Sequence, residues 1–312
     1  MNNKRVTLLG GTGFVGTRLA FLLAERYTEV TVLTRRAQRV RNLRVVPNLH
    51  AREVNVHDAD ALAGALKGVD VVINLVGILN ETGSTTFAKA HDELTGKVVD
   101  ACAAAEVPRY LHMSALNADT ENGTSEYLQS KGRAEDRVRA AGESLAWTFF
   151  RPSIIFGKDD AFFNRFAGLL KALPVFPLAV PDARMAPVWI DDVCRVMIDS
   201  IDDHALYGGA VCLCGPEVFS LRELVEYTAL TAGLKRKIVG LPDWASRLQA
   251  RVMERVPGKP FSYDNYLSLQ TDSVCADDCP RQGTSIEAVV PHYLGEVDWA
   301  GRLQSRRASA RR

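Results

Sequence analysis

A tyrosine and a lysine stand four positions apart in the segment Tyr127-Leu128-Gln129-Ser130-Lys131. In a helix, positions i and i+4 lie on one face, so both side chains reach the same place. A lysine ammonium beside a phenol favours the phenolate, and it can also hold the hydroxyls of a ribose. The tyrosine can then pass a proton to or from a carbonyl group. Tyr127 and Lys131 are therefore candidate catalytic residues.

A glycine-rich segment, GGTGFVG at residues 10–16, follows the apolar run Val6–Leu9 and leads into an amphipathic stretch. Gly10 permits a sharp turn, Gly13 lets a pyrophosphate approach the backbone, and Gly16 lets a helix pack closely on the strand. The free N–H groups and the dipole of the helix start then face the anion. In this context the motif predicts a dinucleotide site rather than an ordinary glycine turn.

The second predicted strand ends in Val32-Leu33-Thr34-Arg35-Arg36. Proteins that select NAD usually carry an acid here, which accepts a hydrogen bond from the ribose 2′-hydroxyl. This chain has no acid at that point but two guanidinium groups, which can bind a 2′-phosphate bidentately. We therefore predict that Arg35 and Arg36 favour NADP(H) over NAD(H). The alternative is that both arginines are solvated turn residues.

The ends of the third and fourth predicted strands supply further candidate contacts. The first side chains past the third strand commonly meet the adenine, which makes Asn55 and Val56 candidates. The fourth strand runs into Leu75, Val76 and Gly77, where the glycine lets the backbone pass close to the cofactor. Packing is an adequate alternative role for each of these residues.

These residues must be positioned by an alternation of strands and helices. Several apolar segments are rich in Val, Ile and Leu, as strands buried on both faces are. The predicted strands are Val6–Leu9, Val30–Thr34, Ala51–Val56, Val69–Val76, Tyr110–Ser114 and Trp147–Arg151. The main predicted helices are Ala59–Leu66, Phe87–Ala105 and Tyr127–Ala141. The alternation predicts an α/β fold, a doubly wound parallel sheet of the Rossmann type with a smaller C-terminal lobe.

Prolines and turn residues divide the rest of the chain. We expect a dinucleotide-binding domain at residues 1–207, with a loop-rich excursion at 158–185. A strand at Ala186–Ile190 and the helix that follows are expected to return to the sheet. Residues 208–301 are expected to form the smaller lobe, for a substrate or a partner, and the segment Ser220–Glu223 is typical of a capping box.

The end of the chain is basic. Residues 302–312 carry five arginines and no acid, which indicates either a solvated tail or a contact with anionic lipid or an acidic partner. Upstream, an apolar stripe repeats every four residues and is expected to be a core face of a helix; it consists of Trp244, Leu248, Val252 and Val256.

Composition narrows the classes further. The chain has 312 residues, a formal net charge of +1 and 47% hydrophobic residues, which gives no case for binding nucleic acid. The first predicted strand begins within a few residues of the N-terminus, and apolar runs such as Val71–Leu79 are too short to cross a bilayer. We therefore expect a cytoplasmic protein of bacterial type, which the basic tail could bring to the inner membrane.

Six cysteines in a chain of this length do not indicate a disulfide scaffold. Cys102 and Cys194 are expected to be small core residues. Four others form no recognised zinc spacing, although together they would make a four-thiolate set; they are Cys212, Cys214, Cys275 and Cys279. The histidines show no metal spacing either, so no metal site is predicted.

Three segments carry a resemblance to a known family. The glycine motif, the Tyr-x3-Lys helix and the segment Arg151–Gly157 resemble an extended or atypical short-chain dehydrogenase/reductase. Met113–Asp119 and Phe156–Phe166 more closely resemble the NADPH-binding accessory alpha subunit of respiratory complex I and its bacterial relatives. The resemblance covers Val6 to Ile201 well and weakens in the C-terminal lobe.

The resemblance implies roles for particular residues. The pyrophosphate would be lined by Gly10, Thr12, Gly13, Phe14, Val15 and Gly16. Lys131 would hold the ribose. The segment that runs alongside the nicotinamide amide would consist of Pro152, Ser153, Ile154 and Ile155. Reductases of this superfamily place a Ser or Thr just past the fifth strand to polarise the substrate carbonyl. Here Leu116 and Asn117 fill that slot. Ser114 lies at the strand end and is a candidate donor, and Thr124 and Ser125 are alternatives.

Three functions are compatible with these residues. The first is an NADPH-binding accessory or assembly protein of the respiratory chain, with a protein partner and little turnover. The second is an active NADPH-dependent reductase or epimerase that uses Tyr127 and Lys131. The third is a regulator that senses NADPH. Loss of a carbonyl-polarising hydroxyl, a hydrogen bond worth roughly 3 kcal/mol, favours the first.

Overall fold

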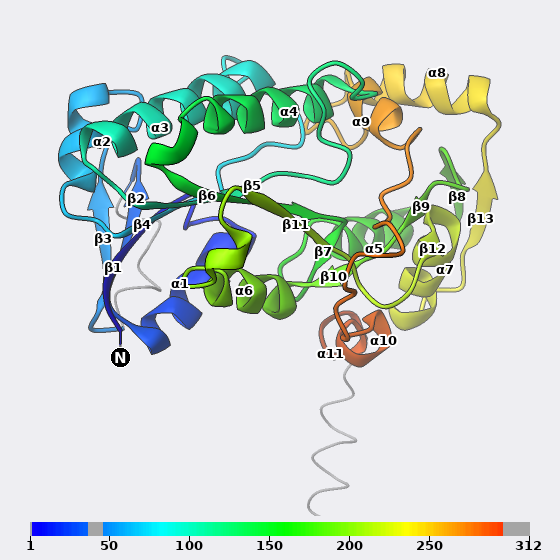
Figure 1. Cartoon of the computed structure of the whole chain (residues 1–312). Helices are drawn as coiled ribbons and strands as arrows, with labels where there is room; N and C mark the ends of the chain where they lie inside the picture. Colours follow the sequence, from blue (N-terminus) through cyan, green and yellow to red (C-terminus); the bar gives the residue numbers. More distant parts are fainter. Residues whose placement is uncertain (1, 37–45, 296–312) are drawn as a thin grey trace, which may run out of the picture.

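A computed structural model describes residues 2–36 and 46–295. Seven parallel strands form the central sheet in the order β11-β6-β5-β4-β1-β2-β3 (Figure 1). Strand β1 lies in the middle, where Leu8 pairs with Val32 on one side and Ile73 on the other. The strands are β1 (Asn2–Leu9), β2 (Tyr27–Thr34), β3 (Leu49–Glu53), β4 (Val71–Asn74), β5 (Arg109–Met113), β6 (Ala146–Pro152) and β11 (Gly209–Leu213). The predicted doubly wound parallel sheet is confirmed.

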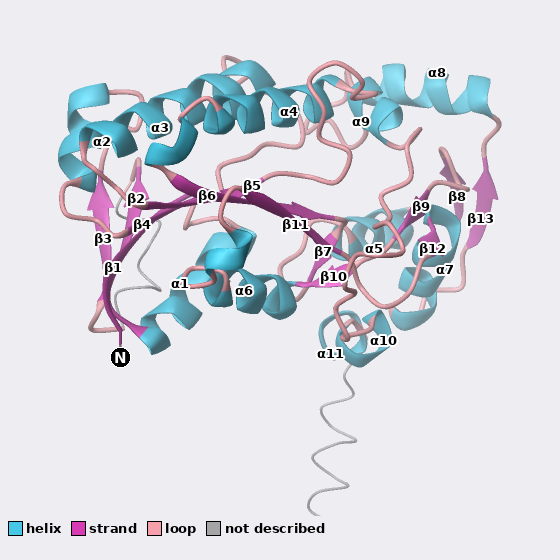
Figure 2. Cartoon of the chain, in the orientation of Figure 1, coloured by secondary structure: helices cyan, strands magenta, loops and turns pink. Residues whose placement is uncertain are grey.

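Helices cover both faces of this sheet (Figures 1 and 2). One layer consists of α1 (Phe14–Arg26) and α6 (Ile190–Asp199), which pack on each other. The opposite layer consists of α2 (Ala59–Leu66), α3 (Leu94–Ala104) and α4 (Glu126–Arg139). Each interface is filled by aliphatic and aromatic side chains from alternate strand positions, as the two-residue period of a strand requires.

Several strand and helix borders differ from the prediction. The third strand lies at Leu49–Glu53 rather than Ala51–Val56, because the chain turns at Asn55 and Asp58 then caps α2 by accepting from the Ala61 N–H. The helix predicted at Phe87–Ala105 begins as a wide turn, η2 (Ala88–Glu93), and continues as α3.

The expected return to the sheet at Ala186–Ile190 is wrong. Only β10 (Val188–Trp189) forms there, and it pairs with β7 (Ile155–Phe156) outside the central sheet. The chain rejoins the sheet one helix later, when β11 pairs with β6. The central sheet therefore extends past residue 207, where the first domain was expected to end.

The smaller lobe is built from both sides of that expected boundary. Its core joins Phe163, Leu170 and Phe176 to Leu224 and Ile286. The elements are α5 (Phe163–Ala172), β8 (Val175–Leu178), β9 (Arg184–Met185), β12 (Phe219–Ser220), α7 (Leu221–Thr231), β13 (Lys237–Gly240), α8 (Asp243–Met253), α9 (Tyr263–Ser268), α10 (Ile286–Val289) and α11 (Pro291–Leu294). Short 3-10 turns lie at η3 (Gly142–Ser144) and η4 (His204–Leu206).

The capping box at the start of α7 is confirmed. Ser220 Oγ accepts from the Glu223 N–H at 3.2 Å, and the Glu223 carboxylate accepts from the Ser220 N–H at 2.7 Å. Two orphan donors of the helix start are thereby satisfied.

The apolar stripe, which runs along α8 and ends just past it at Val256, does not face the core. Trp244 is 71% exposed, Leu248 56%, Val252 53% and Val256 41%. The helix instead buries its narrow small-residue side, Ser246 and Ala250, against the lobe. The periodicity was correct, but a helical stripe does not show which surface covers it.

Two of the cysteine predictions can be followed in the structure. Cys102 and Cys194 are buried core residues, as expected. Cys214 and Cys275, for which no disulfide was predicted, are bonded to each other across 61 positions of sequence.

Within residues 2–36 and 46–295, no helix has the length and apolar character needed to span a bilayer. The predicted basic tail at 302–312 lies outside the described residues.

Candidate functional site

The glycine turn closes tightly between β1 and α1. Gly10 has φ +76°, and a Cβ there would lie 2.8 Å from the Leu75 carbonyl carbon. A Cβ at Gly16 would lie 2.3 Å from the Gly10 carbonyl oxygen, so only glycine allows the helix this approach. Gly13 occupies the N-cap of α1 without a capping side chain. The first N–H groups of α1 are therefore free to face an anion.

The segment after β4 lies against this turn. The side chain of Asn74 fixes its conformation, because Oδ1 accepts from the Val76 N–H at 3.1 Å and Nδ2 donates to the Tyr110 hydroxyl at 3.1 Å. A Cβ at Gly77 would stand 3.2 Å from Lys131 Nζ. The structure thus brings the glycine turn, the Leu75–Gly77 segment and Lys131 together at the carboxyl edge of the sheet, where ligands of such folds bind.

Lys131 lies on α4, and its buried side chain reaches the end of β5. Its ammonium donates a hydrogen bond to the Met113 carbonyl oxygen at 2.9 Å. Burial lowers the pKa of Lys131 to about 8, with Glu135 opposing the shift. This leaves a cation with unused N–H donors beside Gly77, which suits it to hold ribose hydroxyls.

Tyr127 is held one turn earlier on α4, packed edge-on against the rings of Phe87 and His91. Burial, together with the Asp264 carboxylate, raises the pKa of Tyr127 to about 12. Lys131 was expected to favour the phenolate, whereas desolvation of the buried phenol shifts the pKa of Tyr127 in the opposite direction. Tyr127 is a neutral phenol near pH 7.

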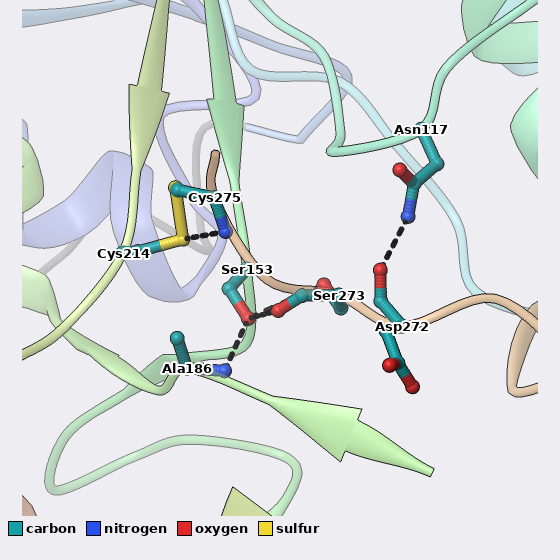
Figure 3. The surroundings of a disulfide bond; sticks show 7 residues. All are labelled: Asn117, Ser153, Ala186, Cys214, Asp272, Ser273 and Cys275. Carbon is teal, nitrogen blue, oxygen red and sulfur yellow. Dashed lines mark hydrogen bonds between the residues drawn. A yellow bond between two sulfur atoms is a disulfide. The ribbon is translucent and has the colours of Figure 1, made fainter. Parts of the chain in front are cut away.

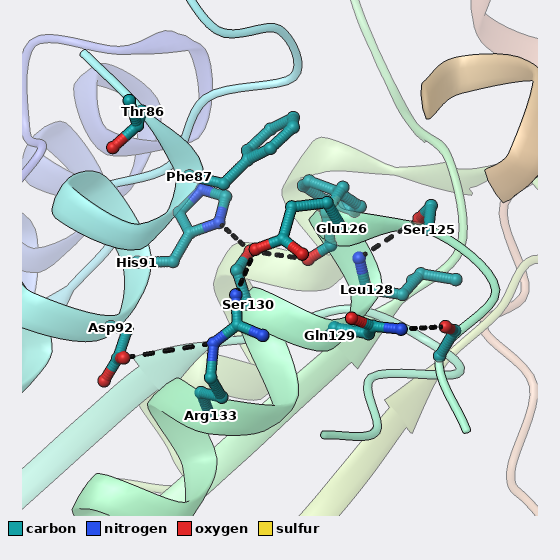
Figure 4. Close-up of polar contacts among 12 residues, drawn as sticks. Thr86, Phe87, His91, Asp92, Ser125, Glu126, Leu128, Gln129, Ser130 and Arg133 are labelled. Atoms are coloured by element: carbon teal, nitrogen blue, oxygen red, sulfur yellow. Dashed lines mark hydrogen bonds and ion pairs between the residues drawn. The ribbon is translucent and has the colours of Figure 1, made fainter. Parts of the chain in front are cut away.

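His91 positions this helix, a role that the sequence did not indicate (Figure 4). Its Nε2 accepts from the Ile78 N–H at 3.0 Å, so Nδ1 carries the proton and donates to Ser130 Oγ at 2.8 Å. Ser130 in turn donates to the Tyr127 carbonyl oxygen. Burial, with a smaller contribution from the Lys131 charge, lowers the pKa of His91 to about 2. A neutral histidine thereby ties the Gly77 loop to α4.

Ser114 is committed to another partner. Its hydroxyl is buried and donates to Glu135 Oε1 at 2.6 Å. The same carboxylate binds Arg151 Nε at 2.8 Å and Arg139 at 2.7 Å. The Ser114 hydroxyl therefore faces α4 in this structure rather than a substrate. Asn117, in the slot where reductases carry a donor, has φ +61° and donates its side-chain amide to the Asp272 carbonyl oxygen at 2.9 Å.

The other predicted contacts lie along the same edge. Arg35 and Arg36 follow β2 and are exposed, and among the described residues neither has an ion-pair partner. Asn55 is exposed after β3, where its Oδ1 accepts from the His57 N–H, and Val56 beside it is half-buried. Pro152 ends β6, and it is followed by the buried Ser153 and the half-buried Ile154 and Ile155.

One further hollow lies at the opposite, amino-terminal edge of the sheet, lined by residues such as Arg5, Glu29 and His50. Ligands of open parallel sheets bind at the carboxyl ends of strands, so this hollow is not the candidate site. Among the described residues no cluster of three or more His, Cys, Asp or Glu side chains has the arrangement of a metal site.

Comparison with known proteins identifies the family. Residues 10–170 match the model of an NAD(P)H-binding family. The chain belongs to this NAD(P)H-binding family. It is 30% identical over 227 residues to the mouse mitochondrial NADH dehydrogenase (ubiquinone) 1 alpha subcomplex subunit 9, covering 71% of the chain and 59% of that subunit. The Arabidopsis thaliana subunit of the same name is 27% identical, over 92% of the chain and 74% of the subunit.

Among solved structures, this NAD(P)H-binding chain resembles UDP-glucuronic acid 4-epimerase from Bacillus cereus, which was crystallised with UDP-glucuronic acid and NAD. The TM-score is 0.65 at 15% identity, covering 85% of the chain and 99% of the epimerase. The predicted resemblance to atypical short-chain dehydrogenase/reductases and to the complex I accessory subunit is therefore confirmed.

The lowered pKa of Lys131 predicts a pH-dependent stability. Between about pH 8 and the unfolded value of 10.5, the unfolded chain binds more protons at this site, so stability rises with pH. Below about pH 8 both states are protonated and the cost of burying the charge is constant. A shift of this size corresponds to about 3 kcal/mol. Without dinucleotide, Lys131→Met should therefore be more stable than the parent by about that amount at pH 7.

Urea unfolding measured from pH 7 to 10.5 checks this expectation, with Lys171→Met at an exposed helix position as the control. The advantage of Lys131→Met should shrink as the pH rises. A difference that stays constant over this range would show that the ammonium is not held in a desolvated site.

Proposed function

We propose that this protein is an accessory member of its family that binds NADP(H) tightly and transfers little or no hydride. The observation that carries the proposal is the pairing of Ser114 with Glu135, beside a Lys131 that remains able to hold the ribose. The dinucleotide would lie along the carboxyl edge, with its pyrophosphate at Gly13 and its nicotinamide toward Ser153. When bound, it would supply the hydride; the chain supplies binding and orientation.

Acid–base catalysis has weak support at this site. A tyrosine that gives a proton to a carbonyl needs a partner that polarises the carbonyl, and the predicted donor, Ser114, already donates its hydroxyl to Glu135. The pKa of Tyr127 is raised to about 12, so its phenol is a weaker acid than an ordinary tyrosine. Transfer of its proton to a substrate carbonyl is therefore slow near neutral pH. Both features favour retention of the cofactor over turnover.

The preference for NADP(H) rests on Arg35 and Arg36. They stand exposed at the end of β2, where the adenosine ribose of a bound dinucleotide would lie. Guanidinium groups without ion-pair partners in the described region favour a 2′-phosphate over a 2′-hydroxyl.

The partner we propose is a protein of the respiratory chain. The support is the similarity to mitochondrial complex I subunits in mouse and Arabidopsis, which extends over most of this chain. An active NADPH-dependent reductase or epimerase is the second candidate, favoured by the correct i, i+4 spacing of Tyr127 and Lys131 on α4. A regulator that senses NADPH would share the binding site and differ in its partner.

If Arg35 and Arg36 set the preference for NADP(H), removing them should lower the affinity for NADPH selectively. Replacing both Arg35 and Arg36 with alanine should weaken NADPH by about ten- to a hundred-fold, since charge-assisted pairs contribute about 1.5–3 kcal/mol. NADH affinity should change little. Calorimetric titration of both cofactors against the parent and the double variant decides the matter, and equal losses for the two would contradict it.

If the site has no hydrogen-bond donor for a substrate carbonyl, Lys131 and Tyr127 on α4 should have separable roles. Lys131→Ala should weaken NADPH binding, because it removes a charge and hydrogen bonds at the ribose. Tyr127→Phe should leave binding and partner association nearly unchanged, since it removes only a proton donor. Stopped-flow loss of NADPH absorbance should show negligible turnover on sugar nucleotides, ketones and quinones. Robust turnover that disappears in Tyr127→Phe would instead establish the reductase.

We also propose a peripheral contact with anionic lipid. The exposed stripe on α8 contains Trp244 and Leu248, and Arg247, Arg251 and Arg255 lie beside it at the same four-residue spacing. An amphipathic helix with aromatic and aliphatic groups next to arginines is the chemistry that binds a membrane interface. The five arginines of residues 302–312 would add to the attraction.

Vesicle sedimentation tests this contact. The double variant Trp244→Ser, Leu248→Ser should bind phosphatidylglycerol vesicles about a hundred-fold more weakly, since burying each side chain contributes about 1.5 kcal/mol or more. Leu230→Ser, at another exposed leucine on α7, is the matched control. Binding should weaken with salt. Protein that ignores anionic vesicles at low salt would rule the contact out.

A further inference from the structure

An irregular segment of the smaller lobe crosses the carboxyl edge of the sheet. We name residues 269–283, between α9 and α10, the strap. Asn117 Nδ2 donates to the Asp272 carbonyl oxygen at 2.9 Å, and Ser153 Oγ donates to the Ser273 carbonyl oxygen at 2.7 Å (Figure 3). The strap therefore touches the loops that follow β5 and β6, including a residue assigned to the nicotinamide end.

Polar contacts hold the middle of the strap. Ser273 N–H donates to the Arg184 carbonyl oxygen at 2.8 Å, and Arg184 N–H donates to the Asp272 carboxylate at 3.0 Å. At its far end Gln282 N–H donates to the Cys214 carbonyl oxygen at 2.8 Å. Between Leu269 and Ile286, the strap residues that join the described apolar clusters are cysteines, Cys275 and Cys279.

Four sulfur atoms gather where the strap meets β11. Cys212 and Cys214 are two positions apart, so they point to the same face of the sheet, opposite Leu213. Cys275 forms the disulfide with Cys214, and both are almost fully buried. Arg281 pairs with Cys214 in a parallel bridge. In a parallel pairing, the residues two positions earlier in each segment also lie opposite each other, which sets Cys279 beside Cys212.

The remaining pair is free and reachable. The register sets the Cys279 thiol next to the Cys212 thiol, and both residues are half-buried rather than enclosed. Burial raises the pKa of the Cys212 thiol, the contact with Cys279 raises it further, and the Arg151 guanidinium opposes these effects. Disulfides that are accessible to solvent reagents are the labile ones, whereas buried ones resist exchange.

We propose that Cys212 and Cys279 are a reversible redox pair, which closes a second disulfide and fastens the strap to β11 beside the buried Cys214–Cys275 bond. The oxidant is a low-molecular-weight disulfide. The Cys279 thiolate attacks one of its sulfurs and expels a thiolate; the Cys212 thiolate then attacks Cys279 and expels the second. Two protons and two electrons pass to the oxidant, which leaves as two thiols.

Closing this bond would steady the strap against Ser153 and Asn117. This consequence, unlike the bond itself, rests on the proposed function, because it requires the nicotinamide to lie toward Ser153. In the oxidised protein the Ser153–Ser273 contact would open less often, so the nicotinamide end would be less accessible to a second ligand. Oxidation or reduction of this pair by small thiols and disulfides would thus change access to the cofactor site.

Differential alkylation and peptide mapping of the intact protein test the bond. After treatment with oxidised glutathione, two of the four free thiols should disappear and map to a Cys212–Cys279 link, and a dithiol should restore them. Cys102 and Cys194 should stay unlinked throughout. Cys212→Ser should leave Cys279 only as a glutathione adduct, and Cys279→Ala should do the converse. A Cys275–Cys279 link, separate adducts in the parent, or one zinc ion bound per chain by all four sulfurs would overturn the proposal.

Hydrogen exchange of residues 270–274 tests the consequence separately. Exchange should slow by about ten-fold in the oxidised parent and stay unchanged in Cys212→Ser, with NADPH affinity measured in parallel. If the link forms but exchange is unaffected, the pair does not steady the strap. If NADPH fails to bind in either redox state while the link still forms, the proposed cofactor function fails and the redox pair stands.

Discussion

The buried carboxylate of Glu135 is the interaction on which the site depends. It lies on α4 and binds the hydroxyl of Ser114 just past β5, the guanidinium of Arg151 from β6 and Arg139 from its own helix. A buried carboxylate is costly unless it is fully paired, and removing one partner of such a group costs about 3–5 kcal/mol. These contacts fix the rotation of α4 against two strands, and Lys131 lies one turn away on the same helix.

This arrangement carries a chemical consequence for the rest of the site. The Ser114 hydroxyl is used to satisfy the carboxylate, and the helix that the carboxylate orients presents a desolvated tyrosine and a desolvated lysine. Desolvation shifts both toward their neutral forms. The same contacts that position Lys131, the residue proposed to hold the ribose, therefore work against a proton relay, and this is the basis of the proposed binding without turnover.

The second lobe acts on the site through hydrogen bonds more than through its core. Asp264 on α9 accepts from the first N–H groups of α4, and the strap reaches Asn117 and Ser153. The lobe thus supplies the acid that raises the pKa of Tyr127 and covers the loops after β5 and β6. Its covalent tie to the sheet runs through Cys214 and Cys275.

Local sequence was sufficient for the parts governed by short-range rules. The glycine turn at 10–16, the strand-helix alternation and the capping box at Ser220 follow from backbone sterics, side-chain periodicity and hydrogen bonds between near neighbours. Each depends on residues within a few positions of one another, so each could be predicted before any fold was known.

What the tertiary structure alone decided involves residues distant in sequence. Whether the α8 stripe faces the core, where Ser114 directs its hydroxyl, which cysteines pair and how burial shifts Tyr127 all depend on what packs opposite. Periodicity identifies a face but not its neighbour, and spacing places two groups together without stating the dielectric around them. Desolvation and pairing are properties of the assembled surroundings, which the linear sequence does not contain.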